Sequence, residues 1–432
     1  MTRGSRWWRP VAVVLAAGLA LTSAVAPPAL AGWSVTDNLS ASNWTAIDWP
    51  WVSVDRQGDA IIAWAACDGA ASACYHQVQV RQKTASGVPG PIKTLSPLGA
   101  EAVWPVVASD DDGDSVVAWE QDRKVMARRV SKTGAVGALS QLSVTGNSAG
   151  QPVVAVDPGG TGIVVWTEIR SGSWYTVARF VYPSGALGSP MTLGSGDGDW
   201  PAMSVDRTGK SVVAWTESNT RVVARRMKPG YTGPATVFAS PSSGIGYGRV
   251  SVDVDRDGDA VVLFRRVDNT TGSTYLWARQ WSRTGVIGKV ISVAPSTDNL
   301  TFYSAVAMDL EGDYVVTWSR RTSQTQTDVF ARRMYRTGTP GAIVRLGVGD
   351  RPAVAVDDDG DGNVVWQSPG PPYDATKIYA RRVTKAGGYG TTTSLLTPIG
   401  RVARAASSPG GRVAAVWQQK SYPYTIHARF GS

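Results

Sequence analysis

The sequence predicts an all-β protein, a single eight-bladed β-propeller of four-stranded blades. The first observation is an aromatic residue that ends a β-branched run eight times, at intervals of 47 to 55 residues. The second is a glycine six positions before each of these aromatic residues, without exception. The third is an arginine that follows in every repeat. Repeats of this length, made of short strands, are typical of propeller blades.

The recurring residues form four columns. The aromatic column is Trp64, Trp119, Trp166, Trp215, Phe264, Trp318, Trp366 and Trp417. The glycine column is Gly58, Gly113, Gly160, Gly209, Gly258, Gly312, Gly360 and Gly411. Nine positions before the aromatic residue lies Asp55, Asp110, Asp157, Asp206, Asp255, Asp309 or Asp357, with Ser408 in the last repeat. The arginine column is Arg81, Arg128, Arg179, Arg225, Arg279, Arg332, Arg381 and Arg429.

Residues 1–31 have the layout of a secretory signal peptide. Arginines precede an apolar run, and Ala29-Leu30-Ala31 supplies the small residues of a cleavage site. We therefore expect an exported, secreted protein that begins at Gly32; an N-terminal membrane anchor is the alternative. No later stretch is apolar for long enough to span a membrane. Without the three arginines of the signal, the formal charge falls from +9 to +6, which is mild.

Composition excludes several classes of protein. Hydrophobic residues make up 43% of the 432-residue chain, which excludes general disorder. The chain has only two cysteines and two histidines, so a disulfide-rich scaffold and a histidine-rich metal centre are excluded.

Each repeat reads as four strands. Segments such as 353–357 and 211–215 are the first two, joined by the Asp-x-x-Gly turn, in which glycine can adopt positive φ. A third strand such as 222–226 and a Thr-Gly-type turn lead to a weaker fourth, such as 289–293. Because the apolar runs are continuous rather than alternating, we expect sheets buried on both faces. The two kinds of turn should share one face of the ring.

The chain ends predict how the ring closes. The last repeat stops after its third strand, at Phe430, and a spare strand-like segment spans residues 33–39. We expect this segment to complete the last blade, so that residues 32–432 form one propeller of eight repeats. A seven-bladed ring with a divergent terminal repeat is the alternative.

The repeat Val-Ala-x-Asp-x-x-Gly-x-x-Val-Val-x-Trp, followed by Ala-Arg-Arg and x-x-Gly, resembles repeats of large secreted bacterial proteins thought to be propeller-like. The resemblance covers nearly the whole mature chain. It implies export and a binding or adhesive scaffold, and it supplies no catalytic residues. The sialidase Asp-box, the tryptophan-docking motif of quinoprotein alcohol dehydrogenases and the WD repeat all fit less well.

One turn offers a weak calcium candidate. Asp253, Asp255, Asp257 and Asp259 copy the first half of an EF-type loop, whose carboxylates suit Ca²⁺. Phe264 stands where that loop requires a bidentate glutamate, so a solvated hairpin turn is the preferred interpretation. No other cofactor is indicated. Cys67 and Cys74 lie in one hairpin loop of an exported protein, and we expect a disulfide between them.

The basic residues do not indicate nucleic-acid binding. One Asp and one Arg per repeat most simply form an ion pair or a backbone hydrogen bond between strands. A second arginine follows the first in four repeats (Arg129, Arg226, Arg333 and Arg382), and we expect it to be exposed.

The candidate ligand site is the mouth of the central channel, on the face opposite the short turns. The variable loops of that face are residues 65–76, 167–175, 265–275, 319–328 and 367–377. One column just before the first strand should surround the mouth: Trp49, Trp104, Gln151, Trp200, Arg249, Tyr303 and Arg351. Such residues can stack on sugar rings or grip a peptide. Alternatively, the aromatic residues pack over the prolines that follow them.

No catalytic constellation stands out, so a non-enzymatic, monomeric protein that binds a glycan or a protein is the leading hypothesis. Glu120, Glu168 and Glu217 recur after three successive tryptophans, and two such carboxylates could serve an extracellular polysaccharide hydrolase or lyase. A structural repeat protein of the cell envelope is the third hypothesis. The sequence does not identify the ligand.

Overall fold

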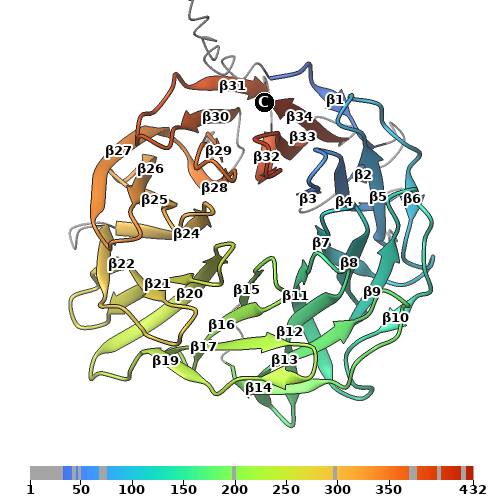
Figure 1. Cartoon of the computed structure of the whole chain (residues 1–432), viewed down its shortest axis with the longest axis horizontal. Coiled ribbons are helices and arrows are strands. Elements are labelled where there is room, and N and C mark those ends of the chain that lie inside the picture. Colours follow the sequence, from blue (N-terminus) through green and yellow to red (C-terminus); the bar gives the residue numbers. More distant parts are fainter. Residues whose placement is uncertain are drawn as a thin grey trace, which may run out of the picture.

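The computed structural model is a closed ring of β-sheets around a central axis (Figure 1). It describes residues 33–40, 45–46, 50–67, 75–196, 201–294, 299–368, 377–396, 400–419 and 425–431. The predicted signal peptide lies outside these residues. Every regular element in the described ranges is a β-strand, and the strands form eight antiparallel sheets. The prediction of an all-β, eight-bladed propeller is confirmed.

Each blade contains an inner, second, third and outer strand. The inner strands of blades 1 to 8 are β3 (Trp51–Val54), β7 (Ala102–Ser109), β11 (Ser148–Val156), β15 (Ala202–Val205), β20 (Ile245–Val254), β24 (Asn299–Met308), β28 (Asp350–Val356) and β32 (Gly400–Ser407). The second strands are β4 (Ala60–Cys67), β8 (Ser115–Gln121), β12 (Gly162–Arg170), β16 (Ser211–Glu217), β21 (Ala260–Asp268), β25 (Tyr314–Arg321), β29 (Gly362–Gln367) and β33 (Val413–Gln419).

The third strands are β5 (Gln77–Lys83), β9 (Lys124–Val130), β13 (Ser173–Val181), β17 (Arg221–Lys228), β22 (Thr274–Trp281), β26 (Thr327–Met334), β30 (Ile378–Val383) and β34 (Thr425–Gly431). The outer strands are β6 (Lys93–Thr94), β10 (Ser140–Gln141), β14 (Met191–Ser195), β19 (Thr236–Ala239), β23 (Ile291–Ala294), β27 (Pro340–Val348), β31 (Thr393–Leu396) and β1 (Asp37–Asn38). Two short extra strands are β2 (Thr45–Ala46), beside β4, and β18 (Tyr231–Thr232), beside β17.

The N-terminal segment closes the ring, as predicted. Strand β1 pairs with β34, so that Asn38 lies opposite His427 (Figure 1). The pairing extends in both directions, because the Ser34 amide donates to the Phe430 carbonyl and the Leu39 amide to that of Ile426. The last blade therefore takes its outer strand from one end of the chain and three strands from the other.

The core lies between blades. Eight clusters of buried side chains fill the eight junctions, and each second strand contributes to two of them. In β16, for example, Val212 packs toward blade 5 and Val213 toward blade 3. Every member of the aromatic column is at most 1% exposed. Burial on both faces explains the continuous apolar runs of the sequence.

The Asp-x-x-Gly turns link each blade to the next. Oδ1 of Asp110 accepts hydrogen bonds from the amides of Asp112 and Asp114 in its own turn. Oδ2 of Asp55 lies 2.7 Å from where a Cβ on Gly113 would stand, and Gly113 has a φ of +93°. A side chain at this glycine would therefore both strain its backbone and collide with the preceding blade. The turns share a face with the Thr-Gly-type turns, because Asp114 also accepts a bond from the Lys132 amide.

The arginine column has a backbone role. Nε of Arg179 donates to the carbonyl of Gly188 in its own blade, and Nη1 donates to that of Leu142 in the preceding blade. Arg81, Arg279, Arg332 and Arg381 repeat the bond to a glycine nine residues later.

The expectation that the second arginines are exposed is wrong. Arg129, Arg226 and Arg333 each donate to a glycine carbonyl in the turn of the next blade, at 2.6 to 2.7 Å. Arg333 is only 2% exposed and forms an ion pair with buried Asp309 at 2.7 Å. These side chains cross the junctions between blades. Contacts of this kind cannot be recognised from the repeats in the sequence, because they depend on how the neighbouring blade is placed.

The segment 167–175 was predicted as a variable loop, and this prediction is also wrong. Strands β12 and β13 continue through it in register, with Thr167 opposite Thr176 and Arg170 opposite Ser173. Only Ser171 and Gly172 form the turn, both with positive φ. Parts of two other predicted loops, 68–74 and 369–376, lie outside the described residues.

Candidate functional site

The predicted mouth residues lie at the irregular part of the inner strands. Trp49 and Trp200 fall outside the described residues, whereas Trp104, Gln151, Arg249, Tyr303 and Arg351 are described and half-buried. In each of these five inner strands the pairing with the second strand shifts at this point, leaving a β-bulge. A bulge redirects side chains out of the ladder, and bulges recur beside functional sites. All five residues lie in the half of the inner strand that is remote from the Asp-x-x-Gly turn.

Three of these bulges hold a non-glycine residue in the left-handed region. Trp104, Gln151 and Arg351 have φ values of 50°, 57° and 51°. Each precedes a proline, which cannot donate a ladder hydrogen bond and is accommodated at a bulge. Such a conformation costs roughly 1 to 3 kcal/mol per residue and persists only where the surrounding structure enforces it.

The column divides between two cavities. Arg249, Tyr303 and Arg351 line a cavity of ≈ 340 Å³ on the ring axis, together with Trp51 and Arg404. Its walls are the inner strands of seven of the eight blades, which face the centre in Figure 1. The described residues that line it include no aspartate or glutamate.

Positive charge gathers in this channel around aromatic rings. The guanidinium carbons of Arg249 and Arg351 lie 5.6 and 4.9 Å from the ring centroid of Tyr303. That of Arg404 lies 5.2 Å from the ring of Trp51. The pKa of Arg404 is lowered to about 10, chiefly by burial and in smaller part by the charges of Arg249 and Arg351, against the opposing effect of Tyr303. The shift therefore reflects mainly the loss of hydration of the guanidinium, to which the like charges add.

Trp104 and Gln151 line a second cavity, between blades 2 and 3. It measures ≈ 200 Å³ and is also lined by Glu120, Arg123 and Trp174. Trp174 is 38% exposed at the end of the β12–β13 hairpin. A side chain at Gly150 would collide with the Glu120 carboxylate. The absence of a side chain at Gly150 therefore leaves the space that this carboxylate occupies. Indole rings beside a carboxylate, an amide and a guanidinium offer both stacking and hydrogen bonding.

The three recurring glutamates have different surroundings. Burial raises the pKa of Glu120, while a bond from the Gln151 amide and the charge of Arg123 oppose the shift. Glu168 is fully buried, where it accepts hydrogen bonds from the indole of Trp166, from Asn147 and from Arg170 at 2.7 to 3.0 Å. Glu217 accepts a bond from the Trp215 indole and pairs with Arg221 at 3.2 Å. Glu168 and Glu217 are thus each engaged within their own blades.

The calcium candidate contains four carboxylates with separate partners. Oδ1 of Asp253 accepts a bond from Ser204 of blade 4, and Oδ2 accepts the Met308 amide of blade 6. Asp255 accepts the amides of Asp257 and Asp259. The Asp257 carboxylate pairs with Arg283, and that of Asp259 accepts the Arg283 amide. In the part of the chain that the structure describes, no three Asp, Glu, His or Cys side chains gather as a metal site would need.

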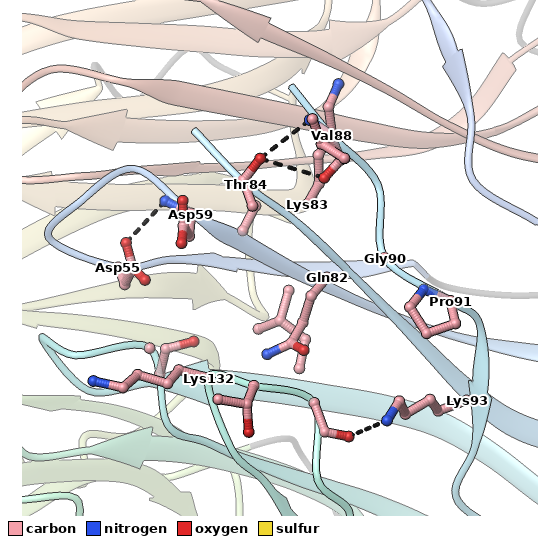
Figure 2. A pocket seen from close by; sticks show the side chains of 16 residues that line it. Asp55, Asp59, Gln82, Lys83, Thr84, Val88, Gly90, Pro91, Lys93 and Lys132 are labelled. Carbon is pink, nitrogen blue, oxygen red and sulfur yellow. Dashed lines mark hydrogen bonds between the residues drawn. The ribbon is translucent and has the colours of Figure 1, made fainter. Parts of the chain in front are cut away.

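The turn face has a hollow of its own between blades 1 and 2, of ≈ 200 Å³ (Figure 2). Its polar groups serve the blade junction. Lys93 donates to the Gly134 carbonyl, and the Gln82 amide donates to that of Ser131 at 2.9 Å. This hollow is therefore a poorer candidate for a ligand than the two cavities described above.

The predicted disulfide is untested by the described residues. Cys67 ends β4 and is buried, and Cys74 lies outside the described ranges. The pairing stays a prediction.

Sequence reasoning missed Arg404, Trp51 and Trp174. Arg404 and Trp51 occupy one column of the inner strands, thirteen positions before the aromatic residue, where the other repeats have Val, Ala or Ser. A large polar or aromatic residue in a column of small ones is the signal that identifies them. Trp174 was hidden within a segment predicted as loop.

Comparisons with known proteins give no family. No protein-family model matches the chain, and no curated protein matches it. Solved structures similar to it include a protein of unknown function from Dyadobacter fermentans (12% identity, TM-score 0.47, covering 93% of this chain and 99% of that one). The polysaccharide lyase Uly1 shows 10% identity and a TM-score of 0.49, with 73% and 87% covered. The β-propeller domain of the Trilobed protease from Pyrococcus furiosus shows 9% identity and a TM-score of 0.47, with 83% and 97% covered. These likenesses carry no argument about ligand or reaction.

No helix in the described ranges is long and apolar enough to span a bilayer.

Proposed function

We propose that this protein is a secreted, non-enzymatic propeller that binds a glycan through its loop face. The observation that carries the proposal is the strained column of mouth residues. Trp104 and Gln151 hold left-handed backbone conformations where they line the cavity between blades 2 and 3. Strain at a cavity is typical of a functional site.

A glycan suits this cavity better than a peptide does. Trp104 and Trp174 offer apolar faces of the kind that stack on sugar rings, and Gln151, Arg123 and Glu120 offer hydrogen bonds at the edges. A cavity of ≈ 200 Å³ is smaller than a usual drug-sized pocket, so it suits a single ring of a polymer that continues along the surface.

A polysaccharide hydrolase or lyase is the second candidate, and Glu120 is what favours it. A carboxyl group whose pKa is raised by burial can serve as a general acid. Two carboxylates are needed for glycoside hydrolysis in most families, and Glu168 and Glu217 are bonded to indoles and arginines in their own blades. Binding without turnover is therefore the preferred function.

The test is a glycan-array screen followed by calorimetry on each hit. Trp174→Ala should weaken binding about tenfold or more, because it removes an exposed stacking surface without opening the core. Trp104→Ala should do the same, with a thermal melt to check folding. Tyr231→Ala is the matched control, since Tyr231 is 51% exposed on the short extra strand β18 and does not line the cavity. Unchanged binding in both tryptophan variants would remove this cavity from consideration.

Turnover is followed on the same hits by chromatography. Product release that is abolished in Glu120→Gln would establish the enzyme instead. Failure of every glycan to bind would favour a structural envelope role.

A further inference from the structure

Glu120 stands in a different register from the two glutamates that it resembles in the sequence. In blades 3 and 4 the buried indole of the second strand donates to a glutamate two positions later. In blade 2 the indole of Trp119 donates to Gln121 at 3.1 Å. Gln121 is therefore the equivalent of Glu168 and Glu217, and Glu120 lies one position earlier, on the other face of the strand. The repetition of glutamate between blades does not account for Glu120.

The alternation of strand β8 sets the direction of Glu120. Val116 and Ala118 pack toward blade 3, whereas Val117 and Trp119 pack toward blade 1. Glu120 continues the first row into the cavity between blades 2 and 3. The equivalent residues of the other repeats are Ala65, Thr167, Thr216, Arg265, Ser319, Gln367 and Gln418. None of these is acidic, so the Glu120 carboxylate is an addition to the blade that the repeats share.

The polar groups of this cavity supply acceptors and donors together. The Glu120 carboxylate accepts hydrogen bonds, and burial raises its pKa, so a bond that a ligand donates to it is stronger than in water. The Arg123 guanidinium donates from Nε to Ser148 at 3.1 Å and has further N–H groups on the same planar fork. Oε1 of Gln151 accepts the Thr167 hydroxyl at 3.4 Å, so the other end of this amide is a donor. Sugar hydroxyls, which both donate and accept, match such a set.

We infer that the cavity between blades 2 and 3 selects a neutral sugar and that Glu120 is the specificity-determining residue, because it accepts sugar hydroxyls and repels acidic sugars. This inference rests on the proposed glycan-binding function. The tryptophans of the cavity offer stacking to any sugar ring, whereas a carboxylate or sulfate on the ring would meet the like charge of Glu120. Discrimination by such a repulsive element adds to the attraction that the hydroxyls provide.

The test is calorimetry on matched pairs of oligosaccharides. Cellotetraose, mannotetraose and galactotetraose are the neutral probes, and the tetrauronates of the same sugars, in which a carboxylate replaces the C6 hydroxyl, are the acidic ones. The neutral member of a pair should bind at least about tenfold more tightly than its uronate.

Glu120→Gln should reverse this preference. It should weaken binding of the neutral probe about 10- to 100-fold, because an amide replaces the charged acceptor. It should also bind the uronate at least about tenfold more tightly than wild type does, because the repulsion is gone. This gain of binding cannot come from a misfolded protein. Glu311→Gln is the matched control and should change neither affinity, since Glu311 is 57% exposed in the Asp-x-x-Gly turn of blade 6 and does not line the cavity.

The outcomes separate the two proposals. If uronates bind to wild type as tightly as the neutral probes, or if Glu120→Gln changes neither affinity, the inference about Glu120 fails while the glycan-binding function stands. If the array and the probes yield acidic glycans alone, the inference fails in the same way. If no glycan binds at all, the proposed function fails and the inference with it. Binding of a glucosamine tetramer more tightly than cellotetraose, lost in Glu120→Gln, would assign the cavity to amino sugars and overturn the neutral assignment.

Discussion

The turn aspartates make stability depend on pH, and Asp255→Asn tests this most directly. Asp255 is 6% exposed, and burial raises its pKa from an ordinary 3.8 to about 6. The amides of Asp257 and Asp259 and the neighbouring Asp259 charge modify the effect of burial without removing it. The charged carboxylate is therefore less stable in the folded protein than in the unfolded chain.

The sign follows from the direction of the shift. A raised pKa in the folded state contributes stability that is fully present below about pH 4 and is lost as the pH rises through about 6. A shift from 3.8 to about 6 corresponds to roughly 3 kcal/mol at neutral pH. Asparagine keeps an acceptor for the two turn amides and carries no charge, so the variant should escape this loss.

The assay is urea denaturation of wild type and Asp255→Asn, followed by tryptophan fluorescence between about pH 4.5 and 7.5. We expect the variant to be the more stable one, and its advantage to grow by about 2 kcal/mol across this range. The other carboxylates titrate in both proteins and cancel in the difference. Asp257→Asn is the control, because that carboxylate is 61% exposed beside Arg283 and should change stability by less than about 0.5 kcal/mol.

Two results would refute the reasoning. A variant that becomes progressively less stable than wild type as the pH rises would mean that the turn needs the charge for its amide bonds. An advantage that does not change with pH would mean that the Asp255 carboxyl does not titrate in this range.

Three other predictions use the same denaturation assay. Arg333→Leu should lower the free energy of unfolding by about 3 to 5 kcal/mol, because it leaves buried Asp309 without its ion pair. Arg382→Leu, at the equivalent but more exposed position, should lower it by about 1 kcal/mol. Equal losses of stability would contradict the role of burial. Leu39→Ala should cost about 2 to 4 kcal/mol, since Leu39 is fully buried at the ring closure, while Val35→Ala, at a residue 80% exposed, should cost less than about 0.5 kcal/mol. A negligible cost at Leu39 would mean that the closing strand is dispensable. Millimolar calcium should shift the melting temperature by less than about 1 °C, because the turn carboxylates already accept amide and arginine bonds; a rise of several degrees that a chelator reverses would establish a calcium site.

Most of the fold could be predicted because the same residue types recur at matching positions of the repeats. Each repeat shows the same glycine and aromatic residue, and seven of eight show the aspartate, so the blade, its turn and the ring closure at residues 33–39 follow from counting. The contacts between blades could not be predicted. Arg129 and Arg333 look like surface residues in their own repeats, and only the placement of the next blade brings a glycine carbonyl within 2.6 Å.

The candidate site was predicted in part. The mouth column was expected just before the first strand of each repeat, whereas in the five described repeats it lies within the inner strand. Its division between two cavities depends on which way each bulge directs the side chain. The prolines at 105, 152 and 352 are the local signal for those bulges, since a proline inside a strand belongs at an edge or a bulge. Arg404 could not be found from the predicted column, because it lies two positions beyond it on the strand.

The bulges also bear on whether the mouth has a function at all. Trp104, Gln151 and Arg351 are chemically unrelated, yet all three hold the same left-handed backbone, in which glycine would carry no strain. Stability alone would favour glycine there, as it does at the Asp-x-x-Gly turns, where the column is glycine in all eight repeats. The two sets of positions lie toward opposite faces of the ring. The mouth positions keep a side chain although it strains the backbone, whereas the turn positions keep glycine. That contrast supports the proposal that a ligand binds on the loop face.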